Sequence, residues 1–178
     1  LHKKRGFNGT VLVTQYNQVL YKGACGYADF QKKDTLTTQK PFQLASVSKQ
    51  FTAMAIMMLQ EEGKLKYEDE VQRFFPDFPY ECITIRHLLT HRSGLPNYTY
   101  FTEKYWKDWR TFISNEEVIQ LMTQHKPAIY FQPDKRFNYS NTGYMLLAAI
   151  VTKASGMPFE QFMQEKIFRP LCMKNSSV

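Results

Sequence analysis

The chain has 178 residues, of which 43% are apolar and 22% charged, a balance typical of a globular protein with a sizeable core and not of a disordered one. The formal net charge is +7, but the basic residues are scattered and not interleaved with aromatic side chains, which argues against a nucleic-acid partner. No apolar run reaches the length of a membrane span, and a polar strand pattern follows the basic start of the chain, which argues against a signal peptide or an anchor.

The first 45 residues predict a β-hairpin. Two runs of β-branched and apolar residues, Thr10–Thr14 and Val19–Tyr21, are separated by the turn-like residues 16–18. The polar residues 31–40 then link the hairpin to the first helix. A two-stranded hairpin alone is marginally stable and leaves unpaired edges, so we expect other strands to complete its sheet.

A helical pattern begins at Ser46 and stops at Gly63. Its predicted apolar stripe comprises Val47, Phe51, Met54, Ala55, Met58 and Leu59. Residues 64–79 then predict a short helix that is broken by Pro76 and Pro79.

Helices are predicted over most of the remaining chain. The first should be capped by Thr84 and end near Gly94, and the second should begin at Ser114 in a capping box with Glu117. A third is expected over residues 141–156 and a fourth from Pro158 to about Pro170. The aromatic and charged residues 98–112 have no clean period and predict a loop or short helices. Because nothing after residue 45 predicts a strand that could complete the sheet, the expected order is a hairpin followed by helices, an α+β chain.

Three cysteines, Cys25, Cys82 and Cys172, form an odd set with no CxxC spacing. This pattern argues against a disulfide framework and against a zinc ribbon. We interpret them as buried free thiols.

Ser46 and Lys49 are three residues apart at the start of the first helix, so they would be neighbours on one face. Ser46 would lie in the first turn, where free N–H groups favour negative charge. A serine hydroxyl is a poor nucleophile until a base takes its proton, and a lysine amine can assist. The same spacing also occurs where the serine only caps a helix, so the pair alone leaves both interpretations open.

Tyr139, Ser140 and Asn141 form a second polar group, just before the buried helix. A tyrosine phenol can act as a general base if a nearby lysine lowers its pKa from about 10. The amide of Asn141 can both donate to and accept from the amide of a substrate. The alternative is a loop tyrosine, with Asn141 capping the helix at Thr142.

His87 and His91 have the spacing of zinc ligands on a helix, but the metalloprotease motif needs glutamate directly after the first histidine, and Leu88 stands there. We therefore reject a metal site and expect packing histidines. The sequence also lacks a Gly-x-Ser-x-Gly elbow, which excludes the α/β-hydrolase route to a reactive serine.

Together these stretches resemble the serine β-lactamase and penicillin-binding-protein superfamily, specifically its class C-like branch. The similar blocks, in family order, are FQLASVSKQFTA, EEGKLKYEDEV, ITIRHLLTHRSGLP, YSNTGYMLLAAIV and IFRPLCM. In this resemblance Ser46 and Lys49 match the Ser-x-x-Lys motif, and Tyr139 to Asn141 match the Tyr-x-Asn motif. The branch also holds D-Ala-D-Ala carboxypeptidases, D-aminopeptidases and esterases.

The resemblance implies that Ser46 forms an acyl-enzyme with an amide or ester, such as a β-lactam or a D-amino-acid peptide. Lys49 and Tyr139 would share the proton transfers, with either as the base, and Asn141 would help hold the substrate amide. The backbone N–H of Ser46 would supply half of an oxyanion hole. The resemblance also implies no cofactor, no metal and an extracytoplasmic location, periplasmic or secreted.

The sequence departs from the family pattern in three places. The third motif, Lys-Thr-Gly or His-x-Gly on a cleft strand, which supplies the other oxyanion N–H, is absent up to Val178. Asp134 and Cys172 stand where glycine is common, and Cys172 would place a side chain where little room is expected.

We therefore expect residues 1–45 to form the N-terminal strands of the α/β lobe and residues 46–178 to form the helical region. Together they would make one incomplete catalytic domain, with the remaining strands and the final helix supplied by a complementary C-terminal segment. Two alternatives to an active hydrolase stay open: a non-catalytic penicillin-binding or sensor module, and an inactive fragment. The aromatic residues 98–109 either shape the cleft or simply pack.

Overall fold

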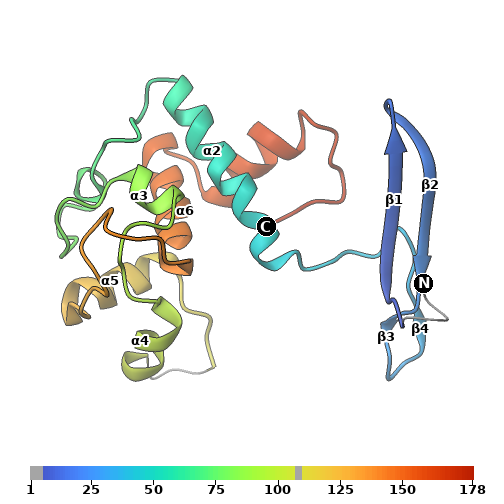
Figure 1. The fold of residues 1–178 in the computed structure, drawn as a ribbon, viewed down its shortest axis with the longest axis horizontal. Helices are drawn as coiled ribbons and strands as arrows, with labels where there is room; N and C mark the ends of the chain where they lie inside the picture. The colour runs from blue at the N-terminus through green and yellow to red at the C-terminus, as the bar shows by residue number, and fades with distance from the viewer. Residues whose placement is uncertain (1–5, 107–109) are drawn as a thin grey trace. The chain divides into compact units, whose positions relative to one another are not determined.

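The computed structural model describes residues 6–106 and 110–178. The chain divides into two compact units, with the boundary between Leu44 and Ala45, and each unit is considered by itself. Figure 1 shows strands in the first unit and helices in the second. The first unit also contains a short second pair of strands, which was not expected, because the sequence predicted only a polar link after the hairpin.

The first unit contains the predicted hairpin. Strand β1 (Gly9–Gln15) pairs antiparallel with β2 (Gln18–Cys25). The two-residue turn between them is Tyr16-Asn17, and both residues have positive φ, 47° and 62°. Two consecutive left-handed residues are typical of a type I′ turn, whose twist matches that of the flanking strands. The hairpin is confirmed, and its strands are longer than the sequence predicted.

A second, very short pair of strands follows the hairpin. Strands β3 (Tyr27–Asp29) and β4 (Asp34–Thr35) are antiparallel to each other. Two side chains support them: Asn8 exchanges two hydrogen bonds with the backbone of Tyr27, and the carboxylate of Asp29 accepts from the N–H groups of the turn. Such short strands leave no alternating pattern, so a hydrophobic period could not predict them.

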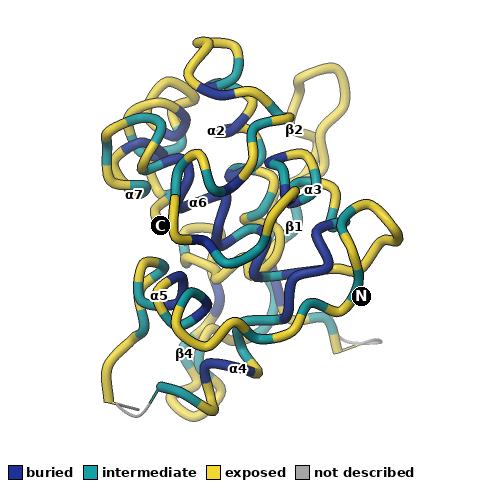
Figure 2. The backbone as a smooth tube through the Cα atoms, turned by 90° about the vertical axis from the view of Figure 1, so that its left-hand side faces the viewer, coloured by how far each residue is buried: buried dark blue, intermediate teal, exposed yellow. Residues whose placement is uncertain are grey.

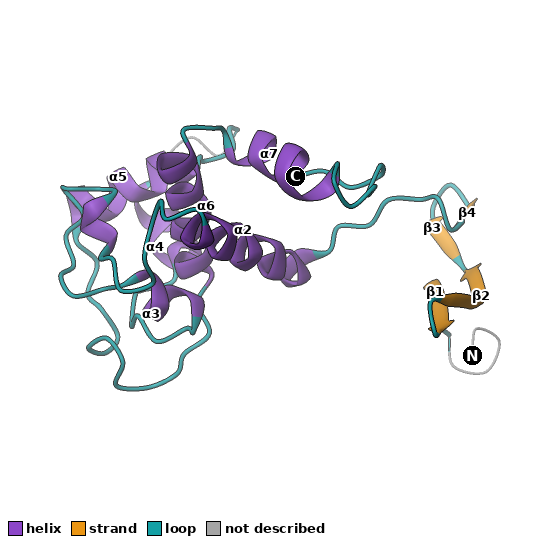
Figure 3. Ribbon diagram, turned by 90° about the horizontal axis from the view of Figure 1, so that it is seen from above, coloured by secondary structure: helices purple, strands orange, loops and turns teal. Residues whose placement is uncertain are grey.

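The second unit is helical (Figure 3). Its elements in chain order are the 3₁₀ turn η1 (Ala45–Ser48), α2 (Lys49–Glu61), the 3₁₀ turn η2 (Val71–Arg73), α3 (Ile85–Leu89), α4 (Tyr98–Tyr105), α5 (Asn115–His125), α6 (Asn141–Ser155), α7 (Phe159–Phe162) and the π-helical turn η3 (Met163–Phe168). Within residues 45–106 and 110–178, the only β-bridge is the isolated pair of Glu70 and Thr84. The α+β class is therefore confirmed.

Helix α6 is the centre of the helical unit. It contacts α2, α3, α5 and α7, and most of its length is buried (Figure 2). It ends at Gly156, which adopts the left-handed conformation with φ 71°, as the sequence predicted. The buried helix expected at residues 141–156 is confirmed, and it gives the N-terminal turn of α6 a rigid base.

The buried face of α2 confirms part of the predicted stripe, because Ala55 and Leu59 are buried and Phe51 and Met58 pack against the core. Its buried residues are Thr52, Ala55, Ile56 and Leu59, whereas Val47 and Met54 are 55% and 47% exposed. Apolar side chains lie on more than one side of α2, so the helical period alone could not identify the side that packs against α6.

The predicted helix caps are mostly correct. The side chains of Thr84 and Ser114 accept from the backbone N–H three residues later, at His87 and Glu117. The cap of α6 is Ser140, whose side chain accepts from Gly143, and not Asn141. Asn141 is instead the first residue of the helix, which leaves its side chain available to the site.

The prediction of buried cysteines is wrong. Cys82 and Cys172 are exposed, Cys25 is partly exposed, and all three are free. Cys82 and Cys172 have positive φ, 60° and 55°, which is typical of tight turns, and turns lie at the surface. Little room was expected at Cys172, but its side chain is exposed here and its backbone is left-handed, a conformation that glycine adopts without strain.

The aromatic segment, for which a loop or short helices were predicted, forms the short helix α4 (Tyr98–Tyr105). Its cap is Asn97, and the N–H of Tyr98 donates to the Thr142 hydroxyl at the start of α6. The part of this segment at residues 107–109 lies outside the described residues. Among the residues that are described, no helix has the length and apolar character needed to cross a bilayer.

Candidate active site

Ser46 lies in η1, the 3₁₀ turn that leads directly into α2, and Lys49 is the first residue of α2. Ala45 precedes Ser46 with φ 46°, a left-handed conformation that is uncommon for alanine. This sharp turn places an exposed serine one helical turn before the lysine. Backbone strain at a single non-glycine residue is frequent at functional sites.

The structure brings four residues of the two motifs together. The Nζ of Lys49 donates to the Ser46 hydroxyl at 3.1 Å and to the Oδ1 of Asn141 at 2.9 Å. The hydroxyl of Tyr139 donates to the Ser46 Oγ at 2.6 Å. The Ser46 oxygen therefore lies between a phenol and an ammonium, although Tyr139 is 93 residues away in the sequence.

The electrostatics of this group favour ionisation of the phenol. Hydrogen bonding to Lys49, and then to Ser46, lowers the pKa of Tyr139 from its usual 10, and Lys49 lies 5.0 Å from the centre of its ring. The neighbouring Tyr144 behaves in the opposite way, because burial and then the charge of Tyr139 raise its pKa. Two phenols a few residues apart are thus set to different protonation behaviour by their surroundings.

His91 packs against Tyr139. The sequence predicted a packing histidine but not that its partner would be Tyr139. Its Nδ1 accepts from the N–H of Ser140 at 3.1 Å, and its carbonyl accepts from Asn138 at 2.8 Å. The imidazole lies against the rings of Tyr139 and Tyr144, with centroids 4.6 and 5.1 Å apart. The sequence around His91 contains no pattern from which its contacts with Tyr139 and Ser140 could be predicted.

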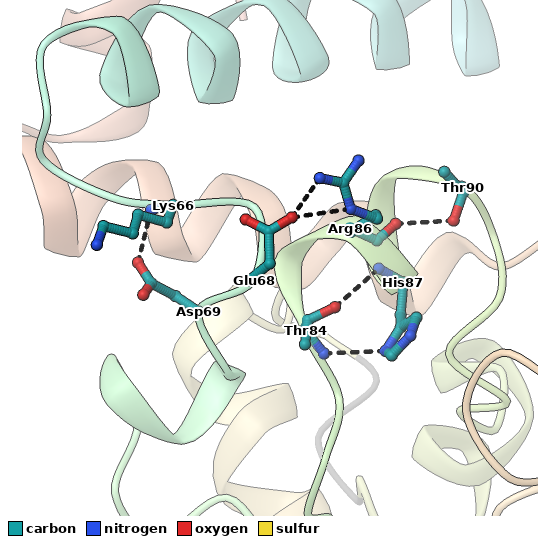
Figure 4. A network of polar contacts seen from close by, with 7 residues as sticks. All are labelled: Lys66, Glu68, Asp69, Thr84, Arg86, His87 and Thr90. Atoms are coloured by element: carbon teal, nitrogen blue, oxygen red, sulfur yellow. Dashed lines mark hydrogen bonds and ion pairs between the residues drawn. The ribbon is translucent and has the colours of Figure 1, made fainter.

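His87 serves the start of α3 instead (Figure 4). Its Nδ1 accepts from the N–H of Thr84 at 3.2 Å, while its own N–H donates to the Thr84 hydroxyl. On the same helix Arg86 pairs with Glu68, which ties the preceding segment to α3. Across the described ranges, 6–106 and 110–178, no three His, Cys, Asp or Glu side chains are grouped in a way that could hold a metal ion.

Asp134, which stands where the resemblance leads us to expect glycine, has a left-handed backbone. Its φ is 65°, and aspartate tolerates the left-handed region better than most residues do. Arg92 holds it through both its side chain, at 2.5 Å, and its carbonyl, at 2.6 Å, and lowers the pKa of its carboxyl. This contact joins the segment after α3 to the segment before Tyr139.

The chain has clear relatives among known proteins. Over residues 2–178 it matches the family described as Beta-lactamase. A penicillin-binding protein of Bacillus subtilis (strain 168) is 43% identical over 178 residues, which cover 100% of this chain and 39% of that protein.

Solved structures agree with this match. A penicillin-binding protein from Bacillus halodurans superposes with a TM-score of 0.86 at 30% identity, covering 99% of this chain and 54% of that one. A D-amino acid amidase from Ochrobactrum anthropi SV3 superposes with a TM-score of 0.78 at 29% identity, covering 97% of this chain and 49% of that one. The chain thus spans about half the length of these proteins, or less. Because the family match extends over nearly all of its residues, the chain belongs to the β-lactamase family, together with the penicillin-binding proteins that it resembles.

Proposed function

We propose that this protein is a serine acyl-hydrolase that forms an acyl-enzyme on Ser46 and cleaves an amide or an ester. The observation that carries the proposal is the position of the Ser46 hydroxyl, 2.6 Å from the Tyr139 oxygen and 3.1 Å from the Lys49 nitrogen. A serine hydroxyl needs a proton acceptor at this distance to become a useful nucleophile.

Tyr139 is the proposed proton acceptor, and Lys49 favours its ionised form. The Ser46 Oγ bonds to the substrate carbonyl carbon as its proton moves to the phenolate oxygen. When the tetrahedral intermediate collapses, the bond to the leaving nitrogen or oxygen breaks and that atom receives the proton from Tyr139. Water then adds to the acyl carbonyl by the same route and releases Ser46. The lowered pKa of Tyr139 and its short contact with Ser46 support this choice over Lys49.

Asn141 has two proposed tasks. Its Oδ1 accepts from Lys49 and holds that ammonium near the phenol. Its side-chain NH₂ group is then directed to the carbonyl of the substrate amide. The backbone N–H of Ser46 is the proposed first donor of the oxyanion hole, and a complementary C-terminal segment with the family's third motif is the proposed source of the second.

The proposed substrates are β-lactams and D-amino-acid amides or peptides, with simple esters as an alternative. The support is the family match and the printed names of two relatives, a penicillin-binding protein and a D-amino acid amidase. An extracytoplasmic location, periplasmic or secreted, is part of the same proposal and is tested by cell fractionation.

Covalent labelling tests the proposal directly. The full-length protein that carries these residues is incubated with a labelled penicillin and, separately, with a fluorophosphonate, and the intact mass and the modified peptide are measured. We expect one added group per chain, located on Ser46, and none in Ser46→Ala. An absent adduct, or an equal adduct in Ser46→Ala, would end the proposal.

Turnover separates the remaining alternatives. Labelling followed by steady release of hydrolysed product supports a hydrolase. A single burst without further product indicates a penicillin-binding or sensor module. Labelling of the full-length protein but not of the 178-residue chain indicates that these residues alone are inactive, as half an oxyanion hole would predict.

A further inference from the structure

His91 holds the segment of Tyr139 at three points. Its carbonyl accepts from the N–H of Asn138 at 2.8 Å, and its Nδ1 accepts from the N–H of Ser140 at 3.1 Å. Between these two hydrogen bonds, its imidazole packs on the phenol ring of Tyr139, with centroids 4.6 Å apart. One residue therefore fixes the backbone on both sides of the proposed base and the ring of the base itself.

The conformation of His91 makes this arrangement possible. Its φ is 58°, a left-handed value that reverses the chain after α3 and directs both its carbonyl and its side chain to the segment before α6. The imidazole also packs on Tyr144, whose hydroxyl donates to the carbonyl of Leu89 at 3.1 Å. The imidazole thus contacts two phenol rings, and the second ring is held in place by its own hydrogen bond.

We propose that His91 is a positioning residue, which keeps the Tyr139 phenol against Ser46 only while its own imidazole is neutral. The inference rests on the proposed function of Tyr139 as the base. The N–H of Ser140 can donate only to an unprotonated Nδ1. Protonation of Nδ1 would place its N–H against the N–H of Ser140 and break this hydrogen bond. The Tyr139 segment would then lose its attachment on the Ser140 side.

Several charged and titratable groups surround His91. Lys49 comes from α2, Tyr144 from α6 and Tyr139 from the segment before α6, while His87 and Arg92 flank His91 on its own segment. Arg92 is paired with Asp134, so Lys49 is the cation that opposes a second positive charge here. Burial first, and Lys49 second, hold the pKa of His91 below its usual 6.5.

Two substitutions distinguish the role of the hydrogen-bond acceptor from that of the imidazole ring. His91→Asn keeps an acceptor oxygen near the position of Nδ1, tolerates positive φ and cannot titrate. His91→Ala removes both the acceptor and the ring contact. His125→Asn is the matched control, because His125 is the last residue of α5 and stacks on Tyr105 instead.

Two measurements are made on the full-length protein. The first is the rate of fluorophosphonate labelling of Ser46 against pH, with the pKa of His91 measured by NMR. The second is the pKa of Tyr139, measured from tyrosinate absorbance with Tyr139→Phe as the blank. Circular dichroism confirms folding, and His91→Asn alone carries the test if His91→Ala does not fold.

In the wild type and in His125→Asn, we expect the labelling rate to fall more steeply once the pH drops below the pKa of His91. This steep limb should be absent in His91→Asn. His91→Ala should be slower by about tenfold or more at neutral pH, as expected for a misplaced catalytic group, and the pKa of Tyr139 should rise toward 10.

The proposal is overturned if His91→Asn keeps the steep limb, or if His91→Ala is labelled at the wild-type rate with an unchanged Tyr139 titration. If the wild type is not labelled at all, the proposed function fails, and the tyrosinate titration still decides the role of His91. A raised pKa of Tyr139 in His91→Ala then supports positioning, and an unchanged pKa refutes it.

Discussion

Lys49 is the side chain that connects the candidate site. Its ammonium donates to Ser46 and to Asn141, and it lies 5.0 Å and 5.7 Å from the ring centres of Tyr139 and Tyr144. A compact ammonium on a flexible stem can satisfy several partners around one point, which the planar fork of arginine cannot. The lysine is therefore suited both to hold the serine oxygen and to favour a phenolate next to it.

The pH dependence of acylation tests this arrangement. Because Lys49 and Ser46 lower the pKa of Tyr139, the phenolate becomes populated below pH 10, and the rate should rise with pH until Tyr139 is ionised. Tyr139→Phe should remove this rise and slow labelling of Ser46 by about a hundredfold or more. The check is the labelling rate across pH, with Tyr100→Phe as a control, because Tyr100 is an exposed residue of α4. An unchanged profile in Tyr139→Phe would exclude the phenol as the base.

The residues of the candidate site were predictable because two short motifs carry them. Ser46 and Lys49 are close in sequence, and Tyr139 and Asn141 follow a recognisable family pattern. His91 was not predictable in the same way, because its contact with Ser140 spans 49 positions and depends on a left-handed turn. A backbone conformation of this kind leaves no periodic pattern in a sequence.

Two segments form the support of the Tyr139 loop. The segment that follows α3 bonds to the segment before α6 at several points, including the N–H of Tyr130 to Gly94 and the N–H of Asp134 to Arg92. Gly94 has φ 72°, and a Cβ atom there would lie 1.9 Å from the carbonyl oxygen of Phe131. Glycine is therefore required at this position for its backbone conformation and for the close approach of the second segment.

Gly94→Ala should strongly destabilise the protein, and Gly63→Ala is its control. Both glycines have φ 72°, but a Cβ atom at Gly63 meets nothing within 4 Å. We expect Gly63→Ala to lower the free energy of unfolding by about 1 kcal/mol from the backbone conformation alone. Gly94→Ala should lower it by about 3 kcal/mol or more, because Phe131 must also move. Urea unfolding measures both, and equal effects would contradict the close approach.

Local signals predicted the elements better than they predicted the packing. The caps at Thr84 and Ser114 and the end of α6 at Gly156 depend on a few neighbouring residues, and all three are confirmed. The buried side of α2 and the exposure of the cysteines depend on which segments meet in space. The apolar stripe of α2 was predicted only in part, and the burial of the cysteines was predicted wrongly, because composition and period do not contain that information.

At the scale of the whole molecule, the two units differ in how much they bury. Apart from Leu36, every buried apolar residue in the described ranges belongs to the helical unit. The β1–β2 hairpin instead exposes apolar side chains, among them Leu12, Val13 and Leu20. A two-stranded hairpin without a covered face has little of its own to stabilise it. This supports the proposal that a complementary segment completes its sheet.

Amide hydrogen exchange on the 178-residue chain tests this difference. We expect the amides of β1 and β2 to exchange close to the rate of an unstructured chain, because their hydrogen bonds are exposed. The amides of α6 should be the most protected, because that helix is buried among four others. Protection of the hairpin equal to that of α6 would show that the hairpin is stable without further strands.

The central claim is that Lys49 and Tyr139 act on Ser46 as one unit, and a double-mutant cycle tests it most directly. The rate of fluorophosphonate labelling of Ser46 is measured at one pH in the full-length wild type, Lys49→Ala, Tyr139→Phe and the double variant. Because residues that act together lose their effect together, we predict that the double variant is about as slow as the slower single variant. If the rate reductions of the two single variants multiply in the double variant, or if neither variant reduces the rate, the claim of a shared site is contradicted.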